Sequence, residues 1–342
     1  MNRLYPLKFK PIIKDKIWGG TKLREVLKKN CKTDKAGESW EISGFPGNIS
    51  KVKNGFLAGN SLEELIEVYM GDMVGDGVFE KFGVLFPLLI KFIDANEVLS
   101  IQVHPDDEMA KKLFDSYGKT EMWYVIETEK DAEMIVGFNQ EVTKETYVHH
   151  LENNSLLTIL NAEKTFPGDV FYLPAGRIHA IGSGVLLAEI QQTSDATLRI
   201  YDFNRVDDKG RPRKLHTEQA LEVIDFKEYP GYKTAYQKKP DQPNLLATCE
   251  YFTTNYLEIT REIERDYFKL DSFVIYICLE GDCTVHCSNG ESETLTKGET
   301  ALLPAEIKHV NLVPSESAKL LEVYVEGIPI GDKTGEILER LF

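Results

Sequence analysis

Two segments of this chain share an unusual order of residues, and they restrict its fold more than any other feature. They are FPGDVFYLPAGRIHAI (166–181) and TKGETALLPAEIKHVN (296–311), and each has a Gly-acid pair, an apolar stretch, Leu-Pro-Ala and then a histidine. A Gly-acid turn that feeds a strand ending at proline is typical of hairpins in antiparallel β-barrels. Two copies in one chain therefore predict a duplicated antiparallel barrel.

Strand-like segments also dominate the rest of the sequence. They are short, rich in Val, Ile, Tyr and Phe, and separated by Gly, Pro, Asn or Asp turns. Examples are 84–92, 122–127, 132–137, 169–173, 184–192, 273–279, 283–287, 300–303 and 320–325. We therefore predict a mainly β protein built from two antiparallel barrels of the jelly-roll type.

Helical patterns are fewer and lie between the strands. Ser61 and Glu64 form a capping box ahead of an apolar helical face, and Asp106 is placed as the N-cap of another helix. The expected helical regions are about 61–81, 106–117, 143–162 (as two helices, 143–153 and 155–162) and 217–225. We expect them to form a small helical segment beside the first barrel.

A change of composition predicts where the two barrels separate. The segment DFKEYPGYKTAYQKKPDQPN (225–244) is rich in Pro, Lys and Tyr and lacks hydrophobic periodicity, which is typical of a linker. The predicted organisation is a domain over 1–225 that includes the short helices, a linker over 226–244, and a second barrel over 245–342.

Charge and cysteine content exclude several classes of protein. The formal net charge of −15 argues against a nucleic-acid surface or binding to an anionic membrane, although one or two local cations still allow a small anionic substrate. No apolar run approaches the ~20 residues that span a bilayer, and residues 1–16 lack the apolar stretch of a signal peptide. The five cysteines form no Cys-x-x-Cys pair, which favours reduced thiols in a cytoplasmic protein.

Polar side chains with metal-binding chemistry stand in or beside the predicted strands. In SIQVHPDDEMA (100–110), Gln102 and His104 project to the same strand face, Glu121 precedes the apolar strand MWYVIE, and His179 follows the Pro-Ala-Gly turn of the repeat. Two imidazoles, a carboxylate and an amide oxygen without a thiolate suit a catalytic Zn²⁺ site and would tolerate Mn²⁺, Fe²⁺ or Co²⁺. Taken singly, Glu121 could instead cap a turn and His179 could bond a carbonyl, while Gln102 could touch the metal or only orient a ligand.

Charged and hydroxyl groups near these residues are candidates for substrate contact. Lys91 lies in the apolar stretch LLIKF and must reach solvent or an anionic partner, because an unpaired buried ammonium is very costly. Ser100 shares the strand face of Gln102, and Lys119 has the same relation to Glu121.

A dense polar segment, LLAEIQQTSDATLRIYDFNR (186–205), adds two further candidates. Glu189 shares one face of its predicted strand with the polar residue Gln191. Arg199 follows a polar loop, where it could pair with an acid or stabilise an oxyanion.

Several of these segments, in the same order, resemble the type I mannose-6-phosphate isomerases (phosphomannose isomerases) in their short bacterial form. The resemblance is carried by LSIQVHPDDEMA, the Glu of KTEMWYVI, LPAGRIHAI and EIQQTSDATLRIYDFNR, together with KDKIWGGTKL and GESWEIS near the N-terminus. It covers residues from about 5 to 225 with specific motifs and the remainder only by general β character. It implies a duplicated cupin fold and one zinc ion per chain.

The resemblance also implies roles for individual residues. It makes Gln102, His104, Glu121 and His179 the metal ligands, and Arg199, Lys119 and Glu189 catalytic groups. It places Ser100 and Lys91 near the substrate phosphate, and Trp18 in the wall of the substrate pocket. The implied reaction interconverts mannose 6-phosphate and fructose 6-phosphate through a cis-enediol, with Zn²⁺ as Lewis acid and a fixed positive charge from Arg199. The general base is Glu189, Lys119 or a metal-bound hydroxide, and the sequence does not choose among them.

The second repeat departs from the first. His309 corresponds to His179, but no Gln-x-His or partnering Glu accompanies it, and Glu280 and His286 have a different spacing. We therefore predict a degenerate second barrel without a metal, since one imidazole alone does not hold zinc.

Two other functions stay open on the sequence alone. One is a metal-dependent cupin dioxygenase, which would need iron and take up oxygen. The other is a non-catalytic, sugar-binding cupin, which would keep the pocket without turnover. The expected partner is a small phosphorylated sugar, with neither nucleic acid nor membrane, and the chain is expected to be a monomer or a homodimer.

Overall fold

The computed structural model describes residues 3–206 and 210–326. The named strands in this part of the chain pair antiparallel throughout, which confirms the predicted mainly β fold. Contacts divide the chain into two compact units. We call Pro11–Asn48 with Leu88–Tyr236 the central unit, and Met1–Lys10, Ile49–Pro87 and Gln237–Phe342 the terminal unit.

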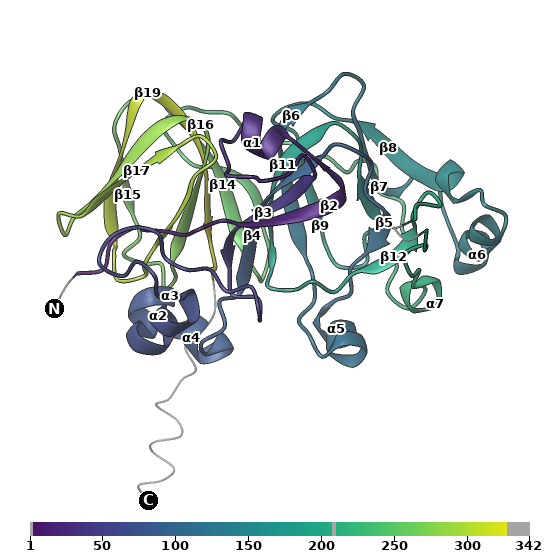
Figure 1. Ribbon diagram of the computed structural model, residues 1–342, viewed down its shortest axis with the longest axis horizontal. Coiled ribbons are helices and arrows are strands. Elements are labelled where there is room, and N and C mark those ends of the chain that lie inside the picture. Colours follow the sequence, from purple (N-terminus) through teal and green to yellow (C-terminus); the bar gives the residue numbers. More distant parts are fainter. Residues whose placement is uncertain (1–2, 207–209, 327–342) are drawn as a thin grey trace, which may run out of the picture. The chain divides into compact units, whose positions relative to one another are not determined.

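Two antiparallel sheets form the central unit (Figure 1). The larger has the order β2-β3-β4-β11-β6-β9, and the smaller has the order β12-β5-β10-β7-β8. The strands of the larger sheet are β2 (Ile12–Gly20), β3 (Ala36–Ser43), β4 (Leu88–Ala95), β6 (Glu121–Thr128), β9 (Val170–Leu173) and β11 (Val185–Gln192). Those of the smaller sheet are β5 (Ile101–Val103), β7 (Glu133–Phe138), β8 (Leu160–Lys164), β10 (His179–Ile181) and β12 (Leu198–Tyr201).

Apolar side chains from both sheets of the central unit meet in one core cluster. Trp123 and Leu187 come from the larger sheet, and Val136 and Ile181 come from the smaller sheet. Because successive strand residues point to opposite faces, alternate positions of the same strands are left for other contacts. Each large side chain that is fully buried here stabilises the fold by about 1.5–3 kcal/mol relative to exposure.

An eight-stranded antiparallel sheet forms the terminal unit (Figure 1). Its main path runs β1-β18-β16-β19-β14-β13, with β15 paired to β19 and β17 to β16. The strands are β1 (Leu7–Lys8), β13 (Asn244–Thr248), β14 (Thr253–Ile259), β15 (Ile263–Asp266), β16 (Val274–Cys287), β17 (Ser292–Thr296), β18 (Thr300–Leu303) and β19 (His309–Tyr324). Apolar residues from the two longest strands, such as Val285 and Leu320, lie in a single buried cluster.

The helices are short, and two of them begin at the predicted caps. Ser61 and Glu64 form the predicted capping box ahead of α2, and the side chain of Asp106 accepts a hydrogen bond from the backbone N–H of Met109 at the start of α5. The helices of the terminal unit are α2 (Leu62–Tyr69), α3 (Gly71–Val74) and α4 (Asp76–Phe82). Those of the central unit are α1 (Lys22–Glu25), α5 (Asp107–Phe114), α6 (Lys144–Glu152) and α7 (Thr217–Ala220), with the 3₁₀ helix η1 (Leu156–Ile159).

The structure corrects two of the expected helices. The segment 155–162 forms η1 and then enters β8, where Leu160 pairs with Phe138 of β7. Hydrogen bonding to the edge strand β7 therefore replaces the expected helix over these last residues. The helix expected over 217–225 ends at Ala220. No helix in the described ranges is long and apolar enough to cross a membrane.

The contacts divide the chain differently from the linear division that the composition suggested. Met1–Lys10 and Ile49–Pro87 group with the C-terminal residues. The reason is long-range pairing within the terminal unit: β1 is a neighbour of β18, and the Asp271 carboxylate accepts hydrogen bonds from the N–H groups of Asp76 and Gly77 at the start of α4.

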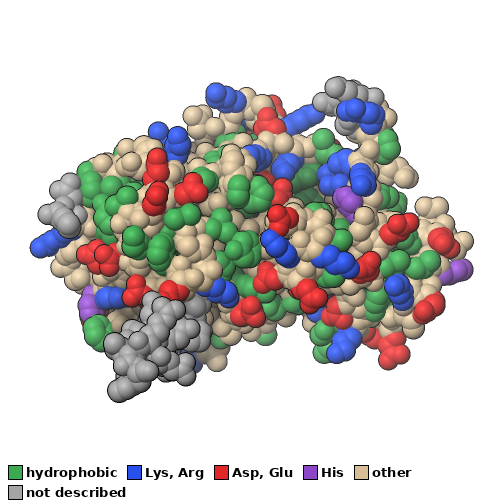
Figure 2. All heavy atoms as spheres, turned by 90° about the horizontal axis from the view of Figure 1, so that it is seen from below, with side chains coloured by type: hydrophobic (Ala, Val, Ile, Leu, Met, Phe, Trp, Pro, Cys, Tyr) green, Lys and Arg blue, Asp and Glu red, His purple; other side chains and the backbone are tan. Residues whose placement is uncertain are grey.

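On the face shown in Figure 2, Lys and Arg side chains lie interspersed with Asp and Glu.

Candidate active site

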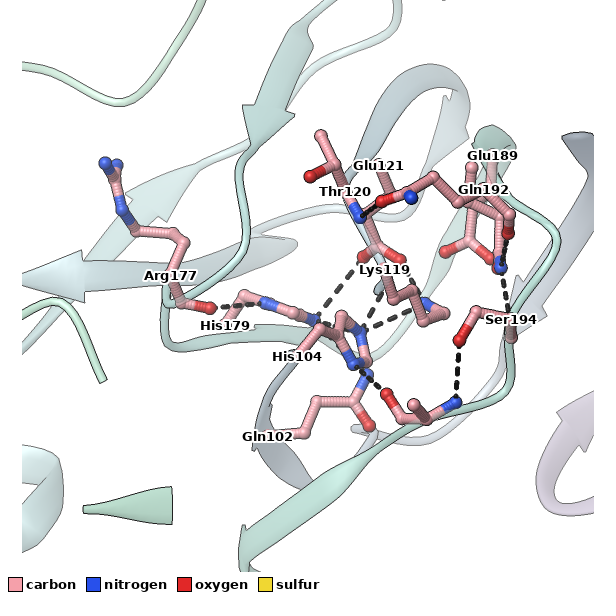
Figure 3. A network of polar contacts seen from close by, with 12 residues as sticks. Gln102, His104, Lys119, Thr120, Glu121, Arg177, His179, Glu189, Gln192 and Ser194 are labelled. Atoms are coloured by element: carbon pink, nitrogen blue, oxygen red, sulfur yellow. Dashed lines mark hydrogen bonds and ion pairs between the residues drawn. The ribbon is translucent and has the colours of Figure 1, made fainter. Parts of the chain in front are cut away.

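Three side chains with metal-binding chemistry meet inside the central unit. His104 follows β5, Glu121 opens β6 and His179 opens β10, and one ligand atom from each lies within 4.8 Å of the other two. The pairing of His179 with Gln102 brings β10 beside β5, and the pairing of Glu121 with Gln191 holds β6 beside β11. All three side chains are buried, and Figure 3 shows them pointing toward one another.

Backbone carbonyls fix the orientation of both imidazoles. His104 Nδ1 lies 3.0 Å from the carbonyl oxygen of Ala196, and His179 Nδ1 lies 2.8 Å from that of Arg177 (Figure 3). A carbonyl only accepts, so each Nδ1 carries the proton and each Nε2 presents a lone pair. These two Nε2 atoms are 3.1 Å apart.

Burial keeps the two imidazoles neutral. Desolvation, and then the positive charge of Lys119, lowers the pKa of His179 to about 3 and that of His104 well below its usual value. Neutral imidazole is the form that binds metals. Two lone pairs facing each other at this distance repel, and a cation between them would remove that repulsion.

Glu121 completes a set of donors that fits a divalent cation. Its Oε1 has no hydrogen-bond partner among the described residues and lies 3.4 Å from His179 Nε2, while its Oε2 lies 3.5 Å from His104 Nε2. Burial, with the charge of Glu189, raises the pKa of Glu121 to about 7. A buried carboxylate with an unbonded oxygen beside two imidazole lone pairs is a site that a metal ion satisfies.

Gln102 lies beside this cluster. Its amide Nε2 is 3.3 Å from His179 Nε2 (Figure 3). The two ends of an amide have the same shape, so a half-turn of the side chain puts Oε1 in the same place. Gln102 therefore stands where its oxygen can reach a cation held by the other three residues.

Two lysines and a glutamate form a charged group next to the cluster. Lys119 Nζ donates to Glu121 Oε2 and lies 3.0 Å from His104 Nε2. Glu189 accepts from Lys91 Nζ and from Trp123 Nε1, each at 2.9 Å. Burial opposes ionisation of Glu189, but the charges of Lys91 and Lys119 outweigh it and lower the pKa to about 2. The two carboxyl groups, Glu121 and Glu189, thus have pKa values pushed in opposite directions, a pattern found in active sites.

Lys91 is engaged by neighbouring side chains of its own unit. Its Nζ donates to Glu189 at 2.9 Å and to the Oε1 of Gln191 at 2.6 Å, and it lies over the ring of Trp40. Burial alone would lower the pKa of Lys91, but the charges of Glu189 and Glu38 raise it.

A cavity of about 290 Å³ opens beside these groups. Seven of the residues proposed from the sequence line it, namely Trp18, Lys91, Ser100, Gln102, Lys119, Glu189 and Arg199. Arg199 Nε donates to Ser100 Oγ at 3.3 Å, and Nη1 donates to the carbonyl of Lys214 at 3.1 Å. The structure therefore brings all ten residues proposed from the sequence to one place, three as the buried cluster and seven around the cavity.

Six polar or charged residues of the cavity wall were not found by sequence reasoning: Lys16, Glu38, Asp195, Thr197, Arg213 and His216. Lys16 and Glu38 lie in KDKIWGG and GESWEIS, where alternation with Trp18 and Trp40 was an available signal. Arg213 and His216 lie in an irregular loop, which offers no periodicity to read.

Known proteins of one family match most of this chain. The catalytic domain of phosphomannose isomerase type I matches residues 6–145, and the cupin domain of mannose-6-phosphate isomerase matches residues 243–325. A probable mannose-6-phosphate isomerase of Bacillus subtilis, GmuF, is 36% identical over 88% of this chain and 94% of its own length. The mannose-6-phosphate isomerase of Streptococcus mutans is 35% identical over 89% of this chain and 93% of its own length.

Solved structures agree with these matches. A crystal structure of the mannose 6-phosphate isomerase from Bacillus subtilis, 33% identical, superposes with a TM-score of 0.83 over 94% of this chain and 99% of that chain. A point mutant of the phosphomannose isomerase from Salmonella typhimurium, 18% identical, shares the fold with a TM-score of 0.77 over 95% of this chain and 100% of that chain. The cupin architecture expected from the sequence is thereby confirmed. With relatives at this level of identity over nearly nine-tenths of its length, the chain belongs to the type I phosphomannose isomerase family.

Proposed function

We propose that this chain interconverts mannose 6-phosphate and fructose 6-phosphate with one bound Zn²⁺. The observation that carries the proposal is the meeting of two imidazole lone pairs and an unbonded carboxylate oxygen at the wall of a polar cavity. Three protein ligands from nitrogen and oxygen donors, with space for another ligand, are typical of catalytic zinc sites.

The chain's own residues would hold the ion. His104 and His179 would bind through Nε2, Glu121 through a carboxylate oxygen, and Gln102 through its amide oxygen. Once bound, Zn²⁺ would act as a Lewis acid toward the oxygens on C1 and C2 of the sugar. Family membership and the donor set support this assignment.

The isomerisation moves a proton between C2 and C1 through a cis-enediol(ate), so one base on one face of the sugar can serve both carbons. Both oxygens of Glu189 are already bonded, one to Lys91 and one to Trp123, and its low pKa makes it a weak base. Lys119 Nζ lies in the cavity wall beside the ligands. A metal ion bound to His104 and Glu121 would take over the two groups that Lys119 Nζ contacts here. We assign the proton transfer to Lys119, which would act as the neutral amine once it is released from them, and we give Glu189 the task of holding Lys91 and Trp123 in place.

Arg199 would stabilise the negative charge that develops on the enediolate oxygen. Its guanidinium is half-buried and, within the described ranges, forms no ion pair, so its charge is not cancelled by a carboxylate. A fixed positive charge in a partly desolvated site acts more strongly than in water.

The test combines metal analysis with a fructose 6-phosphate assay on the purified protein. We expect about one zinc per chain, loss of turnover after chelation and recovery on adding Zn²⁺. Oxygen consumption with bound iron would instead identify a dioxygenase, and sugar-phosphate binding without turnover would identify a binding protein. Either result would overturn the proposal.

A further inference from the structure

Resting on the proposed function, we propose that Arg213 anchors the phosphate group of the substrate and so selects phosphorylated hexoses over free ones. Arg213 lines the same cavity as Arg199 and Lys119, but it comes from the loop that follows β12. None of the sequence motifs singled it out.

A buried aspartate holds Arg213 in a fixed position. The carboxylate of Asp202, which is 5% exposed, accepts a 2.7 Å bond from Arg213 Nε and a second bond from its Nη2. The same carboxylate accepts bonds from Arg205 Nη2 at 2.6 Å and Nε at 3.2 Å. Burial opposes ionisation, but hydrogen bonds from Arg213 and Arg205 lower the pKa of Asp202 and keep it charged.

The tether leaves part of the Arg213 guanidinium available. Nε and Nη2 are used by Asp202, whereas Nη1 makes no hydrogen bond with any residue that the structure describes. A guanidinium carries five N–H donors in a rigid plane, which suits the oxygens of a phosphate. Because Asp202 fixes the plane, little side-chain entropy remains to be lost on binding.

The pairing of charges around the cavity favours binding of an anion beside Arg213. The lysines of the cavity wall all have carboxylate partners. Lys91 is paired with Glu189, Lys16 with Glu38 at 2.8 Å, and Lys119 with Glu121. These three cations are therefore each offset by a carboxylate.

Arg199 and Arg213 differ from those lysines. Arg199 has no carboxylate partner within the described ranges, and Arg213 shares a single carboxylate with Arg205. Arg199 and Arg213 both line the cavity, and so does one further acid, Asp195. A sugar phosphate carries about −1.5 to −2 at neutral pH, so it would meet two guanidiniums here, one of them with no carboxylate partner among the described residues. Burial, and then the nearby charge of Arg213, lowers the pKa of Arg199, as expected for cations that lie close together without enough acids.

The chain offers a matched pair of variants for the test. Arg213→Ala removes the proposed phosphate contact, and Arg205→Ala removes the other arginine of Asp202, which does not line the cavity. Inorganic phosphate serves as the probe, both as a competitive inhibitor of the isomerase assay and in calorimetric titration of the metal-loaded protein.

We expect Arg213→Ala to weaken phosphate binding, and to lower kcat/KM for mannose 6-phosphate, by about 10- to 100-fold, the usual effect of losing a charge-assisted hydrogen bond. Arg213→Lys should recover part of the loss, because a point charge lacks the planar fork. Arg205→Ala should stay within about twofold of the wild type.

Two outcomes would overturn the inference. Phosphate could bind wild type and Arg213→Ala equally. Alternatively, Arg205→Ala could lose as much phosphate affinity and kcat/KM as Arg213→Ala, which would mean that both arginines only hold the loop in place through Asp202. The proposed function fails separately, if the wild-type protein does not turn over mannose 6-phosphate. In that case the calorimetric comparison still decides whether Arg213 binds phosphate.

Discussion

The two units each bury a glutamate completely, and they treat it in opposite ways. In the terminal unit, Glu322 accepts bonds from Arg265 Nε at 2.8 Å, Asn255 Nδ2 at 2.9 Å and the hydroxyl of Tyr267. In the central unit, Glu121 keeps one oxygen without a hydrogen-bond partner among the described residues, next to the Nε2 lone pair of a buried imidazole. A buried carboxylate whose oxygens all accept hydrogen bonds from the protein has a structural role. One that keeps an oxygen without a hydrogen-bond donor is a candidate ligand for a cation.

The repeated histidines show the same contrast. His179 is buried and turned toward the other ligands, while His309, its counterpart in the sequence repeat, is exposed and lies 3.7 Å from Asp266. A shared sequence pattern therefore preserves a turn and a strand without preserving the chemistry. That the terminal unit holds no metal stays a prediction.

The largest expected effect comes from breaking the repeat at its two histidines. His179→Ala should lose the bound metal and at least about 10³-fold in kcat/KM, equivalent to ~4 kcal/mol of transition-state stabilisation. His309→Ala should change kcat/KM by no more than about twofold. Metal content and isomerase kinetics of both variants check this. Equal losses at the two positions would mean that both units take part in catalysis.

The next effect separates metal binding from catalytic charge within the central unit. Arg199→Ala should keep its metal and lose about 10²- to 10³-fold in kcat, because it removes a fixed donor to the enediolate oxygen but none of the ligands. Metal analysis beside steady-state kinetics is the measurement. A fully active Arg199→Ala protein would remove Arg199 from the mechanism.

A smaller effect concerns the satisfied glutamate. Glu322→Gln should lower the free energy of unfolding of the terminal unit by about 2 kcal/mol, because Arg265 then loses its charged partner. Activity and metal content should stay close to wild type. The three tryptophans all belong to the central unit, and the buried thiols of Cys278, Cys283 and Cys287 belong to the terminal unit. Cys31, a further buried thiol, belongs to the central unit, so the experiment uses a Cys31→Ser background. Tryptophan fluorescence and thiol reactivity in denaturant then follow the two units separately, and a shift in fluorescence alone would contradict the prediction.

The smallest effect is a pH dependence of the central unit after chelation. The folded pKa values of His104 and His179 are lowered from 6.5, so their contribution to stability is present above that pH and is lost as the pH falls below it. The raised pKa of Glu121 acts in the opposite sense over the same window. Two histidines outweigh one carboxyl, and the free energy of unfolding should fall by about 1 kcal/mol between pH 6.5 and pH 5.5.

The control for that experiment is the terminal unit, in which both histidines, His286 and His309, are exposed. Its thiol-monitored unfolding should change much less over this pH window. If the two units respond alike, the buried imidazoles are not the origin of the effect.

Much of the site follows from local rules. Alternation along a strand was enough to place Gln102 and His104 together, and the repeat pointed to His179. Capping chemistry was enough for Ser61 and Asp106, because the hydrogen bonds involved span only three residues.

What the sequence could not supply depends on distant partners. Residues 160–162 become a strand only because β7 offers them an edge, and β1 is two residues long and exists only because β18 receives it. The role of Arg213 depends on the burial of Asp202, eleven positions earlier in the chain, which no residue pattern reveals. Such features come from tertiary packing rather than local propensity.

The pairing of Leu7 with Leu302 means that β1 has no partner strand during most of synthesis on the ribosome. At about 5–20 residues per second, β18 is made roughly 15–60 s after β1. All of the central unit has been translated by then, whereas residues 49–87 must wait as well. During that interval the nascent chain exposes apolar positions such as Leu7, Leu62 and Val78, all fully buried in the finished fold. We therefore expect newly made chains to engage chaperones through their first hundred residues, and the central unit to fold before the terminal unit.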